Sequence, residues 1–575
     1  MRQPLSIRAC IMSLTAAGVI AGCAHVPESA RPLRSAADLA KACPALQGQS
    51  IHPSRVGLPS GEARIASAKL VSANAESVSS GAVQPATPEY CLLLGSIAPL
   101  DPKAPLINFQ LNLPLQWNGK TLQYGGGGFN GTLITGLAPL RDAPNGAQSP
   151  LTQGYATLGT DSGHQAAAHP PTEVAAWALN DEALVNFAYA SYKKVKDVAH
   201  ALAADFYGRK PVQSYFFGGS EGGREGLTMA QRFPAEYDGI VSVVPVINYI
   251  GLNHSFMHAQ LLQMAGGGAG WVGPAKIKAL GAGVAKACDA LDGLEDGVVS
   301  NYLACAAKFD PAALRCPGGT DAGAHCLSDV QVAVVKAMYA PYTLVEPMVN
   351  GVKTYPARLP GGEDVPGGGW DAWVAGRSPP TQPVTAGQSR QWLYGGNFIR
   401  YFIARNPDFD LSAYDPANFR LRLREISGLM DSTDPDLSAY FARGGKLIIR
   451  ENASDLAQSG QVGMEYYRSV VARLGQSSVD AHMRLYVSPA STHGGNARSS
   501  RDGAEVPTAF DLLDALDRWV VKHEAPADAL PQVLDAATPP HQVLASRPMC
   551  RYPNYPHYIG GDARQASSYR CTAGD

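Results

Sequence analysis

A serine enclosed by glycines is the feature that most restricts how this chain can fold. Residues 214–226 read SYFFGGSEGGREG, an aromatic run followed by glycines on both sides of Ser220. The residues before it are typical of a buried strand, and a helix is expected after it because no proline follows before Pro234. Strand, tight turn and helix around G-x-S-x-G form a nucleophile elbow, in which the serine hydroxyl stands clear of the backbone. A glycine-rich turn with an incidental serine is the alternative, since 60 of the 575 residues are glycine.

Strand-like and helical segments alternate over much of the chain. A long helix is expected over 180–208, capped by Asn180 or Asp181 and ended by Gly208. Further strands are expected within 104–115, 117–124, 154–160, 237–245, 444–455 and 482–490, and further helices within 463–475 and 509–523. This alternation predicts a mostly parallel α/β sheet.

The alternation breaks down between residues 248 and 440, where glycine and proline become frequent. The chain is also longer than one core normally organises. A sheet interrupted by one long segment is typical of a catalytic core that carries a lid. We therefore expect a core formed by residues 24–247 and 441–575, with an inserted lid domain over 248–440.

The N-terminus has the pattern of an export signal. MRQPLSIR is basic, and the apolar stretch that follows is too short to span a membrane. The residues from Ile20 to Cys23 resemble a bacterial lipobox, so we expect residues 1–22 to be a signal peptide and Cys23 to be lipidated. An ordinary cleaved signal with a chance cysteine is the alternative. The expected location is the outer membrane as a lipoprotein, the periplasm or the exterior.

Export changes how the other cysteines are interpreted. Of the 10 cysteines, Cys10 and Cys23 belong to the signal region, and the remaining even number predicts four disulfides in an oxidising compartment. Their clustering predicts Cys288–Cys305, Cys316–Cys326 and Cys550–Cys571, which leaves Cys43–Cys91 by elimination. A zinc site is the alternative, but the chain has no C-x-x-C spacing.

A serine nucleophile needs a base that takes its proton and an acid that orients the base. After a nucleophile elbow, the acid and then the histidine are expected in loops at the ends of later strands. Asp455 follows the apolar run KLIIR, and His493 follows RLYVSPA. Taken singly, these residues are more simply a helix-capping carboxylate and an exposed imidazole. Together with Ser220, in this order, they predict a catalytic triad.

An oxyanion hole requires two N–H donors. The residue after the nucleophile, Glu221, is expected to supply one. The glycine loop YGGGGFNG at 124–131 is expected to supply the other, from Gly126 or, failing that, from Gly127. The alternative is a loop that is rich in glycine only because its backbone is tightly folded.

Acidic residues gather in CDALDGLEDG at 288–297. Asp289, Asp292 and Asp296 could bind a hard cation together with backbone carbonyls, although the spacing is not that of an EF-hand and a solvated acidic turn is the alternative.

Nucleic acid is an unexpected partner, because the formal net charge is −2 and the chain has no long basic run.

Several of these stretches together resemble the tannase and feruloyl esterase family over most of the mature chain. The matching motifs are WNGKTLQYGGGGFNG, TDSGH, GGSEGGREG, RFPAEYDGIV, CDALDGLEDGVVSNYLAC, CLSDVQ, NPDFD, GGKLIIRENASD and SRPMCRYP. The resemblance implies an α/β-hydrolase core with a large inserted lid. It also implies a triad of Ser220, Asp455 and His493, with oxyanion donors at Gly126 and Glu221.

The resemblance implies two further sites. The acidic loop would be a structural calcium site, with side-chain ligands Asp289, Asp292 and Asp296 and the carbonyls of Leu294 and Val298. Trp373, in GGGWDAW, falls where the family's lid offers an aromatic wall to the substrate, and a tryptophan of the lid core is the alternative. We identify no counterpart of the lid arginine that would bind a terephthalate carboxylate.

The chain departs from the family pattern at two positions. Family members have a cysteine directly before the serine and another directly after the histidine, joined as a disulfide. Here the positions are Gly219 and Gly494. Their joint replacement removes a covalent link beside the site but none of the reacting groups.

The sequence thus predicts an exported serine esterase for small esters of aromatic acids, of the phenolic, galloyl, feruloyl or terephthaloyl type. An esterase for another compact acyl group is one alternative. A lipid-anchored binding protein with a decayed esterase site is another.

Overall fold

The computed structural model describes residues 34–79, 82–385 and 387–574. The predicted signal peptide over 1–22 and Cys23 lie outside these residues. Within them, no helix has both the length and the apolar character needed to cross a membrane.

One large sheet runs through the described chain. In chain order its strands are β1 (Ser50–Ile51), β2 (Ala63–Val71), β5 (Tyr90–Ile97), β6 (Ile107–Pro114), β7 (Lys120–Tyr124), β8 (Ala156–Thr160), β9 (Gln213–Gly219), β10 (Gly239–Val243), β13 (Lys446–Asn452), β14 (Met483–Ser488), β15 (Ala529–Asp535) and β16 (Val543–Arg551). Their order across the sheet is β1-β2-β5-β6-β8-β7-β9-β10-β13-β14-β16-β15. The strands from β8 to β14 are parallel, and both flanks are antiparallel. The predicted α/β class is confirmed. The expectation of a mostly parallel sheet is wrong, because the antiparallel strands on both flanks bring the sheet to five parallel and six antiparallel pairings.

Three short pairs of strands lie outside this sheet. They are β3 (Ser77–Ser79) with β4 (Ala82–Gln84), β11 (Tyr342–Thr343) with β12 (Thr354–Tyr355), and β17 (Asn554–Tyr558) with β18 (Tyr569–Ala573). The sequence predicted none of these three pairs, nor strands β1, β2, β15 and β16.

The helices form two groups along the chain. Those before β10 or after β13 are α1 (Ala36–Ala42), α2 (Asp181–Val185), α3 (Ser191–Tyr207), α4 (Glu221–Arg232), α12 (Gln461–Leu474), α13 (Gln476–His482) and α14 (Leu512–Lys522). Those between β10 and β13 are α5 (Tyr249–Gly268), α6 (Pro274–Cys288), α7 (Tyr302–Lys308), α8 (Asp329–Met338), α9 (Arg390–Asn397), α10 (Arg420–Met430) and α11 (Ser438–Ala442).

The helix predicted over 180–208 is present but interrupted. Asn180 caps it, because its side chain accepts the Ala183 N–H, and Gly208 ends it with a φ of 79°. Between α2 and α3 the segment Asn186–Ala190 forms a π-helical turn. Such turns carry no clear sequence signal, which is why a continuous helix was expected.

The central strand β9 is buried on both faces. Phe216 packs in the cluster that contains Leu227 of α4, whereas Tyr215 and Phe217 pack with Leu516 of α14. Successive strand residues point to opposite faces, so α4 and α14 cover opposite sides of the sheet. This position fixes the carboxyl end of β9, where Ser220 follows.

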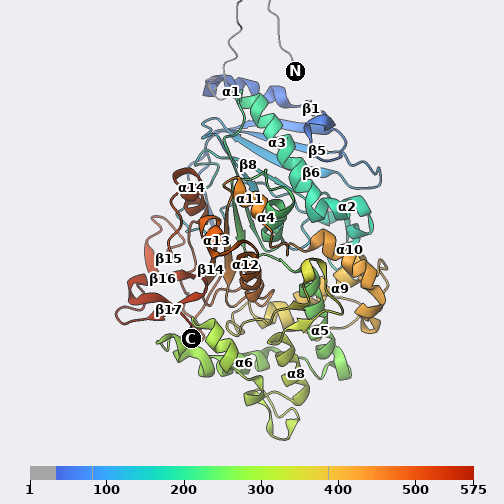
Figure 1. Cartoon of the computed structure of the whole chain (residues 1–575), viewed down its shortest axis with the longest axis vertical. Helices are drawn as coiled ribbons and strands as arrows, with labels where there is room; N and C mark the ends of the chain where they lie inside the picture. The colour runs from blue at the N-terminus through green and yellow to red at the C-terminus, as the bar shows by residue number, and fades with distance from the viewer. Residues whose placement is uncertain (1–33, 80–81, 386, 575) are drawn as a thin grey trace, which may run out of the picture.

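The long inserted segment begins after β10 and ends before β13, and these two strands are paired neighbours, with Val243 opposite Arg450. Its helices α5, α6, α8 and α9 gather in the lower part of Figure 1, and α10 lies at mid-height on the right. The predicted limits of 248–440 and the role as a lid stay predictions.

All four predicted disulfides are present: Cys43–Cys91, Cys288–Cys305, Cys316–Cys326 and Cys550–Cys571. This disulfide content is that of a protein exported to an oxidising compartment. Three of the bridges close short local loops, which is why clustering along the sequence was sufficient to predict them.

Candidate active site

Ser220 lies at a sharp turn between β9 and α4, as the motif predicts. Its backbone has a φ of 60° and a ψ of −121°, a conformation that costs a non-glycine residue about 1–3 kcal/mol. Hydrogen bonds hold it: the Ser220 N–H donates to the Val243 carbonyl at 2.8 Å. A Cβ on Gly218 would overlap the Gly222 carbonyl, so the two motif glycines are required by close backbone packing.

The structure brings the three predicted triad residues together. His493 Nε2 lies 3.0 Å from Ser220 Oγ, and His493 Nδ1 lies 2.7 Å from Asp455 Oδ2. An ionised carboxylate only accepts hydrogen bonds, so Nδ1 carries the proton and Nε2 is left to accept from the serine hydroxyl. Asp455 is itself fixed, because its Oδ1 accepts the N–H groups of Ala457 and Gln458. In this arrangement His493 Nε2 can take the proton of the Ser220 hydroxyl.

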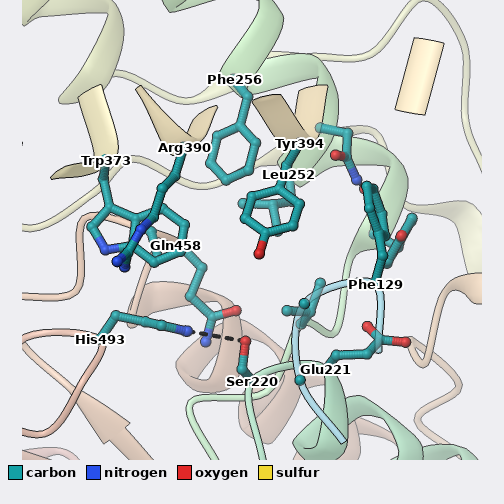
Figure 2. A pocket seen from close by; sticks show the side chains of 16 residues that line it. Phe129, Ser220, Glu221, Leu252, Phe256, Trp373, Arg390, Tyr394, Gln458 and His493 are labelled. Carbon is teal, nitrogen blue, oxygen red and sulfur yellow. Dashed lines mark hydrogen bonds between the residues drawn. The ribbon is translucent and has the colours of Figure 1, made fainter. Parts of the chain in front are cut away.

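A cavity of about 280 Å³ opens in front of the serine. Figure 2 shows the His493–Ser220 hydrogen bond at one side and aromatic side chains around the space above it. Its walls include Phe129 from the glycine loop and Phe256 from α5. The inserted segment therefore supplies part of the wall.

Trp373 lies in this wall, where the resemblance implied it. Its ring centroid is 5.2 Å from that of His493, in an edge-to-face arrangement. Arg390, the first residue of α9, also lines the cavity, and its guanidinium lies 5.1 Å from the Trp373 ring centroid. Arg390 was missed in the sequence, because nothing in SRQWLYGGN indicates which of its side chains faces the serine.

The predicted oxyanion donors are arranged differently from expectation. The Gly126 N–H, the first choice, donates to Glu225 Oε2 at 2.9 Å and is therefore already paired. Gly127, the second choice, lines the cavity beside Ser220 and Glu221. Glu221 begins α4, so its N–H has no acceptor within the helix. The geometry thus favours Gly127 with Glu221 as the pair of donors.

The Glu221 side chain points away from the histidine in Figure 2. It is buried, and its Oε1 accepts Arg224 Nε at 2.7 Å. Burial raises the pKa of the Glu221 carboxyl despite the neighbouring arginine. The ion pair with Arg224 compensates the buried charge beside the elbow.

The predicted calcium loop lies between α6 and α7. Backbone N–H groups of this loop donate to one oxygen of each carboxylate: Gly297 to Asp289, Leu294 to Asp292, and Val298 to Asp296. Asp292 Oδ2 has no hydrogen-bond partner among the described residues although its side chain is buried, and burial raises the pKa of this carboxyl to about 6. An unpaired buried carboxylate oxygen fits a hard cation.

Other contacts of the loop are less favourable to a metal. Asp296 Oδ2 accepts from Arg547 Nη2 at 2.6 Å, so one carboxylate already has a cationic partner. Among the described residues, no three His, Cys, Asp or Glu side chains form a metal-holding group by themselves. That finding does not test a site completed by the carbonyls of Leu294 and Val298, and calcium stays a prediction.

Gly219, which stands where the family has a cysteine, packs directly against Arg141. A Cβ on Gly219 would lie 2.7 Å from both Cδ and Nη1 of Arg141. Gly494 is more open, since a Cβ there would meet only Asn496 Oδ1 at 3.3 Å.

Asp142 packs near the histidine in a similar way. A Cβ on Gly495 would overlap Asp142 Oδ1. The other oxygen, Asp142 Oδ2, lies 3.4 Å from Nη1 of the buried Arg450. The dipeptide Arg141-Asp142 therefore contacts the residue before the serine and the second residue after the histidine.

The model of the family described as tannase and feruloyl esterase matches residues 91–572. The chain belongs to this family. An uncharacterized esterase of Agrobacterium fabrum is 36% identical over 92% of each chain. The mono(2-hydroxyethyl) terephthalate hydrolase of Piscinibacter sakaiensis is 32% identical over 85% of each chain. The solved structure of an esterase from Aspergillus oryzae has a TM-score of 0.73 at 22% identity and covers 93% of this chain and 100% of that one, which supports the fold.

Membership of the family establishes the class of reaction. The family description and the name of the Agrobacterium fabrum relative are those of esterases, and the Piscinibacter sakaiensis relative is named as a hydrolase of a terephthalate monoester. The chain is thus a carboxylic ester hydrolase on an α/β-hydrolase fold.

The packing of Arg141 generates a prediction. Gly219→Cys should lower the melting temperature, because the new side chain displaces Arg141, and overpacking of this kind costs about 1–3 kcal/mol. Gly494→Cys is the matched control and should be nearly neutral, whereas Arg141→Ala should restore stability to Gly219→Cys. Thermal denaturation measures all three. Equal melting temperatures for the two single cysteine variants would contradict the contact.

Proposed function

We propose that Ser220 is the nucleophile of this esterase, His493 its general base and acid, and Asp455 the group that orients the histidine. The observation that carries the proposal is the hydrogen bond between His493 Nε2 and Ser220 Oγ at the floor of an aromatic cavity. Ser220 Oγ attacks the ester carbonyl carbon while its proton moves to His493 Nε2. The carbonyl oxygen becomes an oxyanion that accepts the N–H groups of Glu221 and Gly127.

The intermediate then collapses. The bond to the alcohol oxygen breaks, and His493 gives its proton to that oxygen, which leaves an acyl group on Ser220. Water repeats the sequence: His493 takes a proton from it, the hydroxide adds to the acyl carbon, and the serine oxygen leaves with the proton. The products are the acid, the alcohol and the unchanged enzyme.

The substrate that the cavity fits best is an ester of a single-ring aromatic acid. A space of about 280 Å³ is small, and side chains such as Phe129, Phe256 and Trp373 offer faces and edges for stacking on one ring. Arg390 adds a cation beside Trp373. A guanidinium at the rim of an apolar cavity favours a ring that bears an anionic or oxygen substituent. The named substrate of the Piscinibacter sakaiensis relative, a terephthalate monoester, has such a carboxylate.

Replacement of the nucleophile tests the mechanism. Ser220→Ala should leave the melting temperature nearly unchanged and lower kcat by roughly 10⁴-fold or more, since no acyl-enzyme can form. A fluorophosphonate should label the native chain at Ser220 and leave the variant unlabelled. Retention of more than about a hundredth of the activity would exclude Ser220 as the nucleophile.

Arg390 can be tested with two esters of the same alcohol, a terephthalate monoester and a benzoate. Arg390→Ala should lower kcat/KM for the terephthalate ester by roughly 10- to 100-fold, the range expected for a lost hydrogen bond to a charged group, and should affect the benzoate much less. Arg377→Ala, an exposed arginine of the same segment that does not line the cavity, is the matched control. Equal losses on both esters would contradict recognition of a ring substituent.

We further propose that the acidic loop holds a calcium ion that stabilises the inserted segment and takes no part in the reaction. Asp289, Asp292 and Asp296 would provide carboxylate oxygens, and the carbonyls of Leu294 and Val298 would complete the set. Supporting this is the buried, unpaired Asp292 Oδ2. The loop lies between Cys288 and Cys305, which are joined, so a bound ion would reinforce a segment already closed by a disulfide.

Excess chelator should therefore lower the melting temperature, because a ligand that binds only the native state stabilises it by mass action. Asp292→Asn should remove this response, whereas Asp310→Asn, an exposed acid of the same inserted segment, should keep it. Differential scanning calorimetry with elemental analysis makes the measurement. A native protein that contains no metal and does not respond to the chelator would rule the site out.

We also propose attachment to a membrane through a lipid on Cys23, supported by the lipobox-like residues before it. Mass analysis of the mature N-terminus would show the lipid, and an unmodified N-terminus at another residue would exclude it.

A further inference from the structure

Glu225 is a buried acid to which the proposed mechanism gives no role. It lies on α4, four residues after Glu221, and its side chain is fully buried. Its Oε2 accepts the Gly126 N–H at 2.9 Å, and its Oε1 lies 2.5 Å from the hydroxyl of the buried Tyr192 on α3. One side chain thus connects the helix that follows the nucleophile with the glycine loop.

The backbones of the loop and the helix are in direct contact at the same place. A Cβ on Gly222 would lie 2.6 Å from the Gly126 carbonyl oxygen, and a Cβ on Gly125 would lie 2.7 Å from Gly222 Cα. The Gly125 N–H donates to the Phe217 carbonyl, which ties the start of the loop to β9. The next N–H, that of Gly126, is held only by Glu225 in the described chain. The Glu225 bond therefore fixes the Gly125–Gly126 peptide, which directly precedes the peptide that carries the Gly127 N–H.

The two proposed oxyanion donors belong to these two elements. Glu221 is the first residue of α4, and Gly127 follows the residue that Glu225 binds. An oxyanion hole works only when both N–H groups are aimed beforehand at the same oxygen. We propose that Glu225 is a positioning residue for the oxyanion hole, which fixes the Gly127 N–H relative to the Glu221 N–H through its bond to Gly126. This inference rests on the proposed serine mechanism.

The protonation state of Glu225 fits this role. The titratable groups that face it are Tyr192, Glu221, Arg224 and Tyr237. Burial, reinforced by the Glu221 carboxylate, raises the pKa of Glu225 to about 8, so the group is mostly neutral at pH 7. In either protonation state Oε1 can accept from the Tyr192 hydroxyl while Oε2 accepts from the Gly126 N–H, so both bonds persist when the acid is neutral. The ionised form would place a negative charge close to a developing oxyanion, which opposes the transition state.

Two substitutions separate positioning from structure. Glu225→Met fills a similar volume without an acceptor for the Gly126 N–H. Its kcat should fall by roughly 10- to 100-fold, which is less than the fall expected when an oxyanion donor is removed altogether. Its KM should stay within about threefold of the native value. Glu225→Gln is uncharged at every pH, and its amide oxygen can accept from the Gly126 N–H while the Tyr192 hydroxyl turns to accept from its amide N–H. Its kcat at pH 7 should stay within about threefold of the native value.

The pH profile gives a second readout. As pH rises through about 8, native kcat should fall because Glu225 ionises, whereas Glu225→Gln should not show this fall. Glu363 provides a matched control, because it is also buried and accepts both a tyrosine hydroxyl and a glycine N–H, from Tyr339 and Gly361, but it does not line the cavity. Glu363→Met should change the melting temperature while kcat stays within about threefold.

The outcomes distinguish this inference from the mechanism on which it rests. A kcat in Glu225→Met within threefold of native, a loss in Glu225→Gln as large as that in Glu225→Met, or equal losses in Glu225→Met and Glu363→Met would each overturn the role of Glu225. If Ser220→Ala still abolishes turnover in that case, only the positioning role fails. If Ser220→Ala is active, the serine mechanism fails and the positioning role fails with it.

Discussion

The close contact between two glycine backbones is the constraint on which the rest of the site depends. The loop after β7 lies against the first turn of α4 with no room for a Cβ on Gly222 or Gly125. That contact places the glycine loop beside the strained serine, so the nucleophile and the loop N–H groups reach one cavity. Glycine is therefore required in both motifs for the same physical reason, and the two motifs, about a hundred residues apart in the sequence, form one structural unit.

The groups that react are those that the sequence predicted best. Ser220, Asp455 and His493 each follow a buried strand, and neighbouring parallel strands end at the same edge of the sheet. Their meeting is thus a consequence of strand order, which local patterns indicate well. Three of the four disulfides were predictable because the two cysteines of each are close along the chain.

The residues that surround the reacting groups could not be predicted in this way. Arg141, Arg390 and Glu225 contact the site through tertiary packing between segments that are far apart in sequence, and none has a local pattern that marks it. The flanking strands β1, β2, β15 and β16 were missed because β1 has only two residues and the other three contain no run of β-branched or aromatic residues. For Gly126, the sequence indicated the correct loop, but only the contact with Glu225 shows that its N–H is already paired.

The reacting groups and the cavity wall come from different parts of the chain. The sheet and α4 hold the serine, the histidine, the acid and the proposed oxyanion donors, while the segment between β10 and β13 contributes Trp373, Arg390 and Phe256 to the cavity wall. Changes in the inserted segment can alter which acyl group fits without moving the reacting atoms. Next to the serine, the Arg141 side chain occupies the space that a cysteine side chain at Gly219 would need, and Asp142 packs against Gly495 beside the histidine. Packing and ion pairing there brace the serine and histidine loops in a chain that has no cysteine beside either residue.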